Sequence, residues 1–133
     1  MQNFRDLHVW ERSHLFALAV RRAVRAFPGR GYAELKSQIV RAAESIPANI
    51  VEGCGAATRK EFARFLDISI KSTSEVEYRL QLAKDNGVLG PSLADSLTRE
   101  VVEIRRMVCG LRRAVLNADR SGAPERDRSN GSR

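Results

Sequence analysis

The stretch that decides the fold is Leu35–Leu66, LKSQIVRAAESIPANIVEGCGAATRKEFARFL. Its first half repeats apolar residues at steps of three and four, the spacing of a helix that buries one face. These residues are Leu35, Ile39, Ala42, Ala43, Ile46, Ile50 and Cys54. The stripe keeps its phase across Pro47, although proline removes a backbone donor and opens a helical turn. The sequence therefore predicts one helix kinked at Pro47 rather than two helices.

The second half of this stretch predicts a turn followed by another helix. Gly53 and Gly55 supply the permissive backbone that ends a helix. Thr58 is followed three residues later by Glu61, which is the spacing of a capping box at a helix start. Leu35–Leu66 therefore predicts an antiparallel helical hairpin.

Helices are also predicted on both sides of this hairpin. The first covers about 6–26 and ends at Phe27-Pro28, because proline disfavours helix at the residue before it. The third helix covers 59–86, and the fourth covers about 91–118 with a regular apolar stripe. No segment alternates as a strand does. The fold class predicted is all-α, an antiparallel up-down-up-down four-helix bundle with a Pro-kinked second helix.

The domain organisation follows from a change of composition near the end of the chain. Residues 1–118 hold all the apolar stripes and form the predicted bundle. Residues 119–133, DRSGAPERDRSNGSR after Ala118, are polar and rich in Gly, Pro and Ser. Such a segment buries too little apolar surface to offset its ordering entropy, so a disordered tail is predicted.

The first predicted helix is apolar around more of its circumference than its bundle position requires. Trp10, Leu15, Leu18 and Ala19 widen its apolar surface. Two interpretations are open: an interface with another subunit, or deep burial between two helices of the same chain. We favour the interface.

Composition points to a basic cytoplasmic protein. The net charge is +7 and the pI is about 10.2, which favours polyanionic partners such as nucleic acid or an acidic membrane surface over plain solubility. The N-terminus has charges where a signal peptide needs apolar residues, and no run is long enough to span a bilayer. Cys54 and Cys109 are far apart in sequence, so two buried thiols are expected, with a disulfide as the alternative.

No residue pattern predicts catalysis, a metal or a cofactor. His8 and His14 have no cysteine or carboxylate partner at metal-ligand spacing. Cys54 has no nearby histidine to act as a base, so burial at a helix end is the expectation. We therefore expect a protein that is not an enzyme.

The basic residues fall into two predicted clusters. One end of an antiparallel bundle brings together Arg21, Arg22, Arg25, Arg30 and Lys36. The opposite end brings together Arg59, Lys60, Arg112 and Arg113. Solvated helix ends, favoured by the helix dipole, are one interpretation, and phosphate binding through counterion release is the other. No aromatic residue is interleaved, so recognition is expected to use backbone and shape rather than base stacking.

Several segments resemble a known family. QIVRAAESIPANIVEG (38–53) and KEFARFLDIS (60–69) resemble the four-helix-bundle proteins encoded within intervening sequences of bacterial 23S ribosomal RNA. LHVWERSHLFALAV (7–20), FPGRGYAELKSQI (27–39) and EVEYRLQLAKDNGVL (75–89) extend the resemblance. The accessory protein of diversity-generating retroelements is similar to that family. The resemblance implies homopentamers, and its retroelement relatives imply binding to nucleic acid and to a reverse transcriptase.

The motif residues that match the family are Arg41, Pro47, Asn49, Glu52 and Gly53. We interpret Arg41 and Glu52 as a partly buried pair or an intersubunit contact, with nucleic-acid binding by Arg41 as a second choice. Asn49 is expected to bond carbonyls freed at the proline. Two departures stand out: Glu44 replaces an apolar or small residue, and Ala56-Ala57 replaces a basic pair, which weakens the case for nucleic-acid binding at that turn.

The hypothesis from sequence is a non-catalytic homopentameric accessory protein that binds nucleic acid, RNA before DNA. The alternative is an oligomeric protein–protein scaffold whose basic surface meets an acidic protein.

Overall fold

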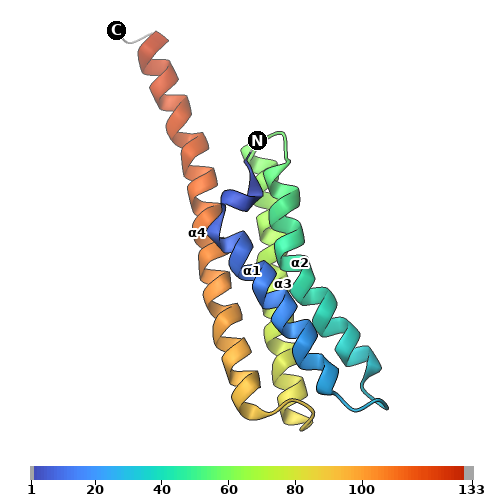
Figure 1. Cartoon of the computed structure of the whole chain (residues 1–133). Coiled ribbons are helices and arrows are strands. Elements are labelled where there is room, and N and C mark those ends of the chain that lie inside the picture. Colours follow the sequence, from blue (N-terminus) through green and yellow to red (C-terminus); the bar gives the residue numbers. More distant parts are fainter. Residues whose placement is uncertain (1, 131–133) are drawn as a thin grey trace.

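The computed structural model describes residues 2–130 of the chain, with side chains described for residues 2–118. Four helices form an up-down-up-down bundle (Figure 1). They are α1 (His8–Ala23), α2 (Ala33–Cys54), α3 (Arg59–Asp85) and α4 (Pro91–Asn130). Short 3-10 turns at Phe4–Asp6 and Val24–Ala26 flank α1. The predicted fold class is confirmed.

Each helix packs against its neighbours in sequence, and α1 closes the bundle against α4. Arg12 on α1 donates two hydrogen bonds of 2.8 Å to the Glu100 carboxylate on α4. Lys84 on α3 donates a 2.8 Å bond to Asp95 just after the following turn. These pairs fix the register of α4 against α1 and α3 at the bundle surface.

Aliphatic side chains from all four helices fill the core. The most completely buried are Val20, Ile39, Ile46, Ile50, Leu66, Val76, Leu80, Val101, Ile104 and Val108. Among them are Ile39, Ile46 and Ile50, which helical spacing predicted for the buried face of the second helix. Burying this set away from water is the main favourable term in folding.

The second helix runs unbroken through Pro47, as predicted. Asn49 donates a 2.8 Å bond to the Ser45 carbonyl, and not to the Ala43 carbonyl that loses its helical partner at the proline. Pro47 is buried. The single helix survives because its apolar stripe packs continuously on both sides of the proline.

Small hydroxyl residues hold α2 close to α3. Ser69 is fully buried, and its Oγ donates a 2.8 Å bond to the Ile46 carbonyl. One turn further along α3, Ser72 Oγ lies 2.8 Å from Ser45 Oγ. Small side chains permit this approach, and each hydroxyl finds a partner at the seam.

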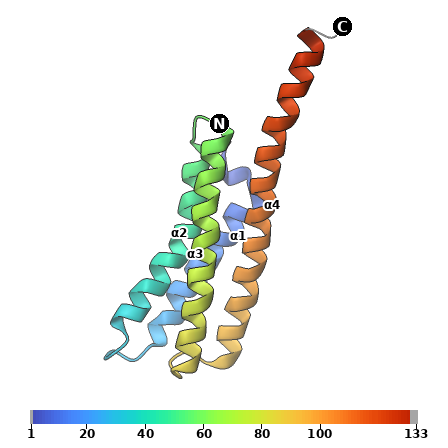
Figure 2. The ribbon, with the colours of Figure 1, turned by 180° about the vertical axis from the view of Figure 1, so that it is seen from behind.

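Helix boundaries differ modestly from the predicted ones, mostly by a residue or two. The first helix begins at His8 rather than at Asp6, because residues 4–6 form a separate 3-10 turn. Helix α4 continues past Ala118 to Asn130, and its last turns project beyond the other helices (Figures 1 and 2). The predicted disorder of residues 119–133 stays a prediction, and residues 131–133 lie outside the described part.

Candidate nucleic-acid interface

The end of α1, the loop after it and the start of α2 meet at one end of the bundle (Figure 1). This segment carries five of the basic residues predicted as binding residues: Arg21, Arg22, Arg25, Arg30 and Lys36. All five are exposed. With Glu34 as the only acidic residue between Arg21 and Lys36, five positive charges and one negative charge give a net +4, more than half of the +7 of the chain.

Arg21 is the one member of this group with an ion-pair partner in the described structure. Its Nη2 and Nε atoms donate bonds of 2.8 and 3.0 Å to Glu44 Oε2 on α2. The pair is half exposed, so it adds little stability, but it reduces the charge that Arg21 offers to a ligand. Among residues 2–118, the other four form no ion pair: Arg22, Arg25, Arg30 and Lys36. We call these four residues the α1–α2 cluster.

At the opposite end, Arg59 and Lys60 are exposed on the first turn of α3. The predicted N-cap is confirmed, because Glu61 N donates to Thr58 Oγ1 at 3.1 Å. The Glu61 carboxylate accepts a 3.1 Å bond from Ala57 N, one residue before the Thr58 N–H that a capping box uses. A free helix N-terminus attracts phosphate through its unpaired N–H groups. Here the Thr58 hydroxyl occupies the N–H of Glu61, and the Glu61 carboxylate adds a negative charge at the helix start, so phosphate recognition at this end would depend on the basic side chains.

Arg112 and Arg113 do not join Arg59 and Lys60 in one cluster. Arg112 Nε donates a 2.6 Å bond to Asp67 Oδ1. Asp67 lies eight residues into α3, about 12 Å along the helix axis from Arg59. The second predicted cluster is thus spread along the bundle, and only Arg113 of this α4 pair is exposed.

Arg105 is a further basic residue on α4 that is less available than its sequence suggests. Its side chain bonds to Thr73 Oγ1 at 2.9 Å and to Glu77. Both partners lie on α3, far from Arg105 in sequence, so residue spacing within α4 could not predict these two bonds. Within α4 itself, Arg106 lies 3.5 Å from Glu103, three residues earlier.

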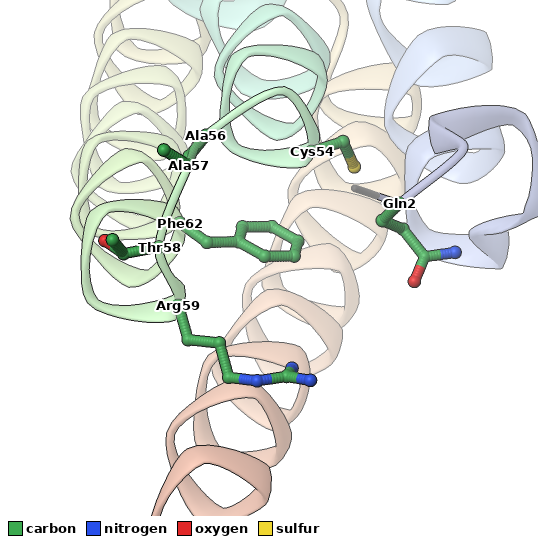
Figure 3. A pocket seen from close by; sticks show the side chains of 7 residues that line it. All are labelled: Gln2, Cys54, Ala56, Ala57, Thr58, Arg59 and Phe62. Carbon is green, nitrogen blue, oxygen red and sulfur yellow. The ribbon is translucent and has the colours of Figure 1, made fainter.

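A cavity of about 290 Å³ lies at the turn between α2 and α3 (Figure 3). It is lined by Gln2, Cys54, Ala56, Ala57, Thr58, Arg59 and Phe62. Burial raises the pKa of the Cys54 thiol, which disfavours the reactive thiolate. No lining residue is a histidine or carboxylate, so the wall of the cavity supplies no base for Cys54.

The surroundings of the two histidines and of the second cysteine do not resemble a catalytic or metal site. His14 stacks on Trp10 with ring centroids 5.1 Å apart, and His8 lies 3.8 Å from Glu11. Both cysteines are free, and Cys109 is half-buried rather than buried as expected. Within the described residues, no group of three or more His, Cys, Asp or Glu side chains is placed to hold a metal ion.

The motif residues Arg41 and Glu52 are both exposed and share one face of α2. Eleven residues separate them by about 16 Å along the helix, too far for a direct pair within the chain. The interpretation as a partly buried pair is therefore wrong, which leaves an intersubunit contact or a binding role. Packing explains the glycine at position 53, because a Cβ there would lie 2.7 Å from Phe62 Cδ1.

The outer face of α1 carries exposed apolar side chains. Leu15 is 55% exposed and Leu18 is 40% exposed. Leu15 also lines a groove of about 600 Å³ between α1 and α4. Its other walls are the apolar Phe16, Ala19 and Leu97 and the polar or charged Arg12, Ser96, Arg99 and Glu100. Burial between two helices of one chain, the alternative interpretation, does not hold for Leu15 and Leu18.

The family comparison agrees with this architecture. The model of the 23S rRNA-intervening sequence proteins matches residues 5–110. The chain belongs to this family. The matched segment covers α1 to α3 and the bundled part of α4, so the features described above all lie within the intervening-sequence protein domain or next to it.

A solved structure supports the same fold. It is the crystal structure of a protein of unknown function from the S23 ribosomal protein family of Bacteroides thetaiotaomicron VPI-5482. The two chains are 25% identical, with a TM-score of 0.70 over 77% of this chain and 96% of the other. No curated protein matches the chain. No helix among residues 2–130 is both long and apolar enough to cross a membrane.

Proposed function

We propose that this intervening-sequence protein is a non-catalytic, homo-oligomeric accessory protein that binds nucleic acid, with RNA as the first candidate. The observation that carries the proposal is the α1–α2 cluster, four exposed cations with no ion-pair partner among the described residues. Cations without partners release counterions from nucleic acid at little cost in broken ion pairs. Cytoplasmic location and contact with a reverse transcriptase or another protein belong to the same proposal.

Homo-oligomerisation is supported by the outer face of α1. Leu15 and Leu18 are exposed, and Leu15 lines a groove with apolar and charged walls; exposed apolar side chains gathered on one face are typical of surfaces that another protein covers. A ring of five subunits, as the family resemblance implies, would also multiply the number of α1–α2 clusters on one particle. Several weak phosphate-binding ends then act together through their high effective concentration.

The test is a fluorescence-anisotropy titration with structured RNA, duplex DNA and an acidic peptide at several salt concentrations. We expect nucleic-acid affinity to fall linearly with salt on logarithmic axes, and the acidic peptide to bind weakly. The triple variant Arg22→Ala/Arg25→Ala/Lys36→Ala should reduce the magnitude of the salt slope by about three, one for each lost phosphate contact.

A matched control removes three other exposed cations that have no ion-pair partner among residues 2–118, in the variant Arg5→Ala/Arg64→Ala/Lys71→Ala. It changes the net charge by the same amount, but at the N-terminal 3-10 turn and on α3. Equal losses in both variants would mean diffuse attraction rather than binding at the α1–α2 end. No binding by the wild-type protein at low salt would refute the proposal.

A protein scaffold is the second candidate, and the exposed Leu15 and Leu18 favour it. Tight binding of the acidic peptide without nucleic-acid binding would select this alternative.

A further inference from the structure

The loop between α1 and α2 is short and held at both ends. Phe27 is buried in the core, and Tyr32 packs against the core from the other side of the loop. Only Pro28, Gly29, Arg30 and Gly31 lie between them. The tip that carries Arg30 is therefore fixed to the bundle by aromatic side chains, which lowers the entropy lost when it binds a ligand.

The two glycines beside Arg30 differ in whether the backbone conformation requires a glycine. Gly31 has φ of 85°, a conformation that disfavours any side chain. Gly29 has no such φ, and a Cβ added there would meet nothing within 4 Å. Neither backbone conformation nor packing within the described chain explains why Gly29 lacks a side chain. A bare backbone beside an exposed cation permits close approach to an external surface.

We propose that this loop enters a groove of double-stranded nucleic acid, with Arg30 between the two rows of phosphates. This inference rests on the proposed function and names its substrate class as duplex. A chain of glycine, arginine and glycine is much thinner than a helix, which is about 10–12 Å wide with its side chains. Narrow grooves concentrate negative potential and attract inserted arginine.

The remaining members of the α1–α2 cluster suit the flanks of such a groove. Arg22 is exposed at the end of α1, Arg25 in the 3-10 turn Val24–Ala26 that follows it, and Lys36 on the first turn of α2. The loop joins these two helix ends (Figure 1), so cations precede and follow Arg30 along the chain. Cations on either side of a protruding tip match phosphates on either side of a groove.

A single strand is the less suitable ligand for this end. Binding single strands without sequence preference commonly uses exposed aromatic rings on which bases stack. Of the two aromatic residues at the ends of the loop, Phe27 is buried in the core and Tyr32 is half-buried against it. The α1–α2 end thus offers positive charge and a thin backbone, but no fully exposed aromatic ring.

The experiment measures anisotropy with duplex RNA, duplex DNA and single-stranded RNA of equal length, all at one low salt concentration. Arg30→Ala should weaken duplex binding about tenfold, as expected for one lost charge-assisted contact, and leave single-strand binding nearly unchanged. Gly29→Leu keeps every charge but adds a bulky side chain where the bare backbone would approach the duplex, so it should also weaken duplex binding. Comparing the two duplexes identifies which groove shape is preferred.

Lys71→Ala is the matched charge control, because Lys71 is exposed on α3, has no ion-pair partner among residues 2–118 and lies outside the α1–α2 loop and the α1–α4 groove. If Arg30→Ala and Gly29→Leu bind duplex as Lys71→Ala does, the loop proposal is overturned while nucleic-acid binding stands. Stronger binding of the single strand by the wild type also overturns it. If the wild type binds no nucleic acid, both proposals fall. Circular dichroism of each variant confirms that the bundle is intact.

Discussion

At the residue scale, Gly53 sets how closely α2 and α3 approach at their shared turn. A Cβ there would lie 2.7 Å from Phe62 Cδ1 and 3.3 Å from the Phe62 carbonyl oxygen. The ring can shift toward the neighbouring cavity, but the carbonyl belongs to α3 and moves only with the helix. We therefore expect Gly53→Ala to destabilise the fold by about 1–3 kcal/mol, the usual cost of overpacking.

Thermal unfolding measures this effect directly. The double variant Gly53→Ala/Phe62→Leu should recover part of the loss, because the smaller side chain vacates the position of the ring. A Gly53→Ala protein as stable as the wild type would show that Phe62 relaxes freely into the cavity.

Cys54 makes a residue-scale prediction about pH. Burial raises the pKa of its thiol above the ordinary value of 9.0, so the unfolded thiol ionises at a lower pH than the folded one. The resulting stabilisation is complete below the unfolded pKa and is lost as the pH rises through the folded pKa. The wild-type melting temperature should therefore fall more than that of Cys54→Ala between about pH 8.5 and pH 10.

The pKa of Lys84 is also raised, mainly by its hydrogen bond to Asp95, but from an ordinary value of 10.5. Its contribution has the same sign and lies at higher pH, so ending the titration near pH 10 separates the two groups. Parallel curves for wild type and Cys54→Ala would contradict the assignment.

Individual residues also show what sequence alone can predict. The Thr58 N-cap of α3 was predictable because its partner, Glu61, lies within one helical turn. The partners of Arg105 and Arg112 were not, because each lies on another helix and depends on the register between α3 and α4. Which arginines remain without partners is therefore a property of the assembled bundle.

At the element scale, α4 contains a glycine that its own chain does not explain. Gly110 is exposed in mid-helix, and a Cβ there would meet nothing within 4 Å. Alanine at such a position stabilises a helix by about 1 kcal/mol relative to glycine. We expect Gly110→Ala to raise the melting temperature by about 4 °C.

The same variant, measured for particle mass, gives a second result. An unchanged mass would mean that no partner helix approaches α4 closely at this position. A lower melting temperature would contradict the prediction, because it would reveal packing at Gly110 that the single chain does not contain.

The element scale is where sequence was most informative. Apolar spacing identified the helices and carried α2 through Pro47, because burial of a continuous stripe outweighs one missing hydrogen bond. The end of α4 was harder to predict. The residues after Ala118 have no apolar stripe, and stripes were the signal from which helix ends were inferred.

At the scale of the whole molecule, the bundle separates two kinds of surface. The outer face of α1 is apolar around Leu15 and Leu18. Two exposed cations follow it along the chain, Arg22 at the end of the helix and Arg25 in the 3-10 turn after it. An oligomer joined through the apolar part would place basic ends from several subunits near one another. Self-association and nucleic-acid affinity should therefore be coupled.

This coupling gives the last prediction. The variant Leu15→Arg/Leu18→Arg should lower the particle mass in light scattering toward that of one subunit, since buried unpaired charges are costly at an interface. Its matched control is Ile68→Arg/Tyr78→Arg, which changes two exposed apolar residues on α3, diagonally across the bundle from α1. The control should keep the wild-type mass. Although the α1 variant gains positive charge, it should bind nucleic acid more weakly than the control, because avidity is lost when the subunits separate. If only the α3 variant dissociates, the interface lies on α3; if the wild type is itself a single subunit, the exposed leucines of α1 serve some other contact.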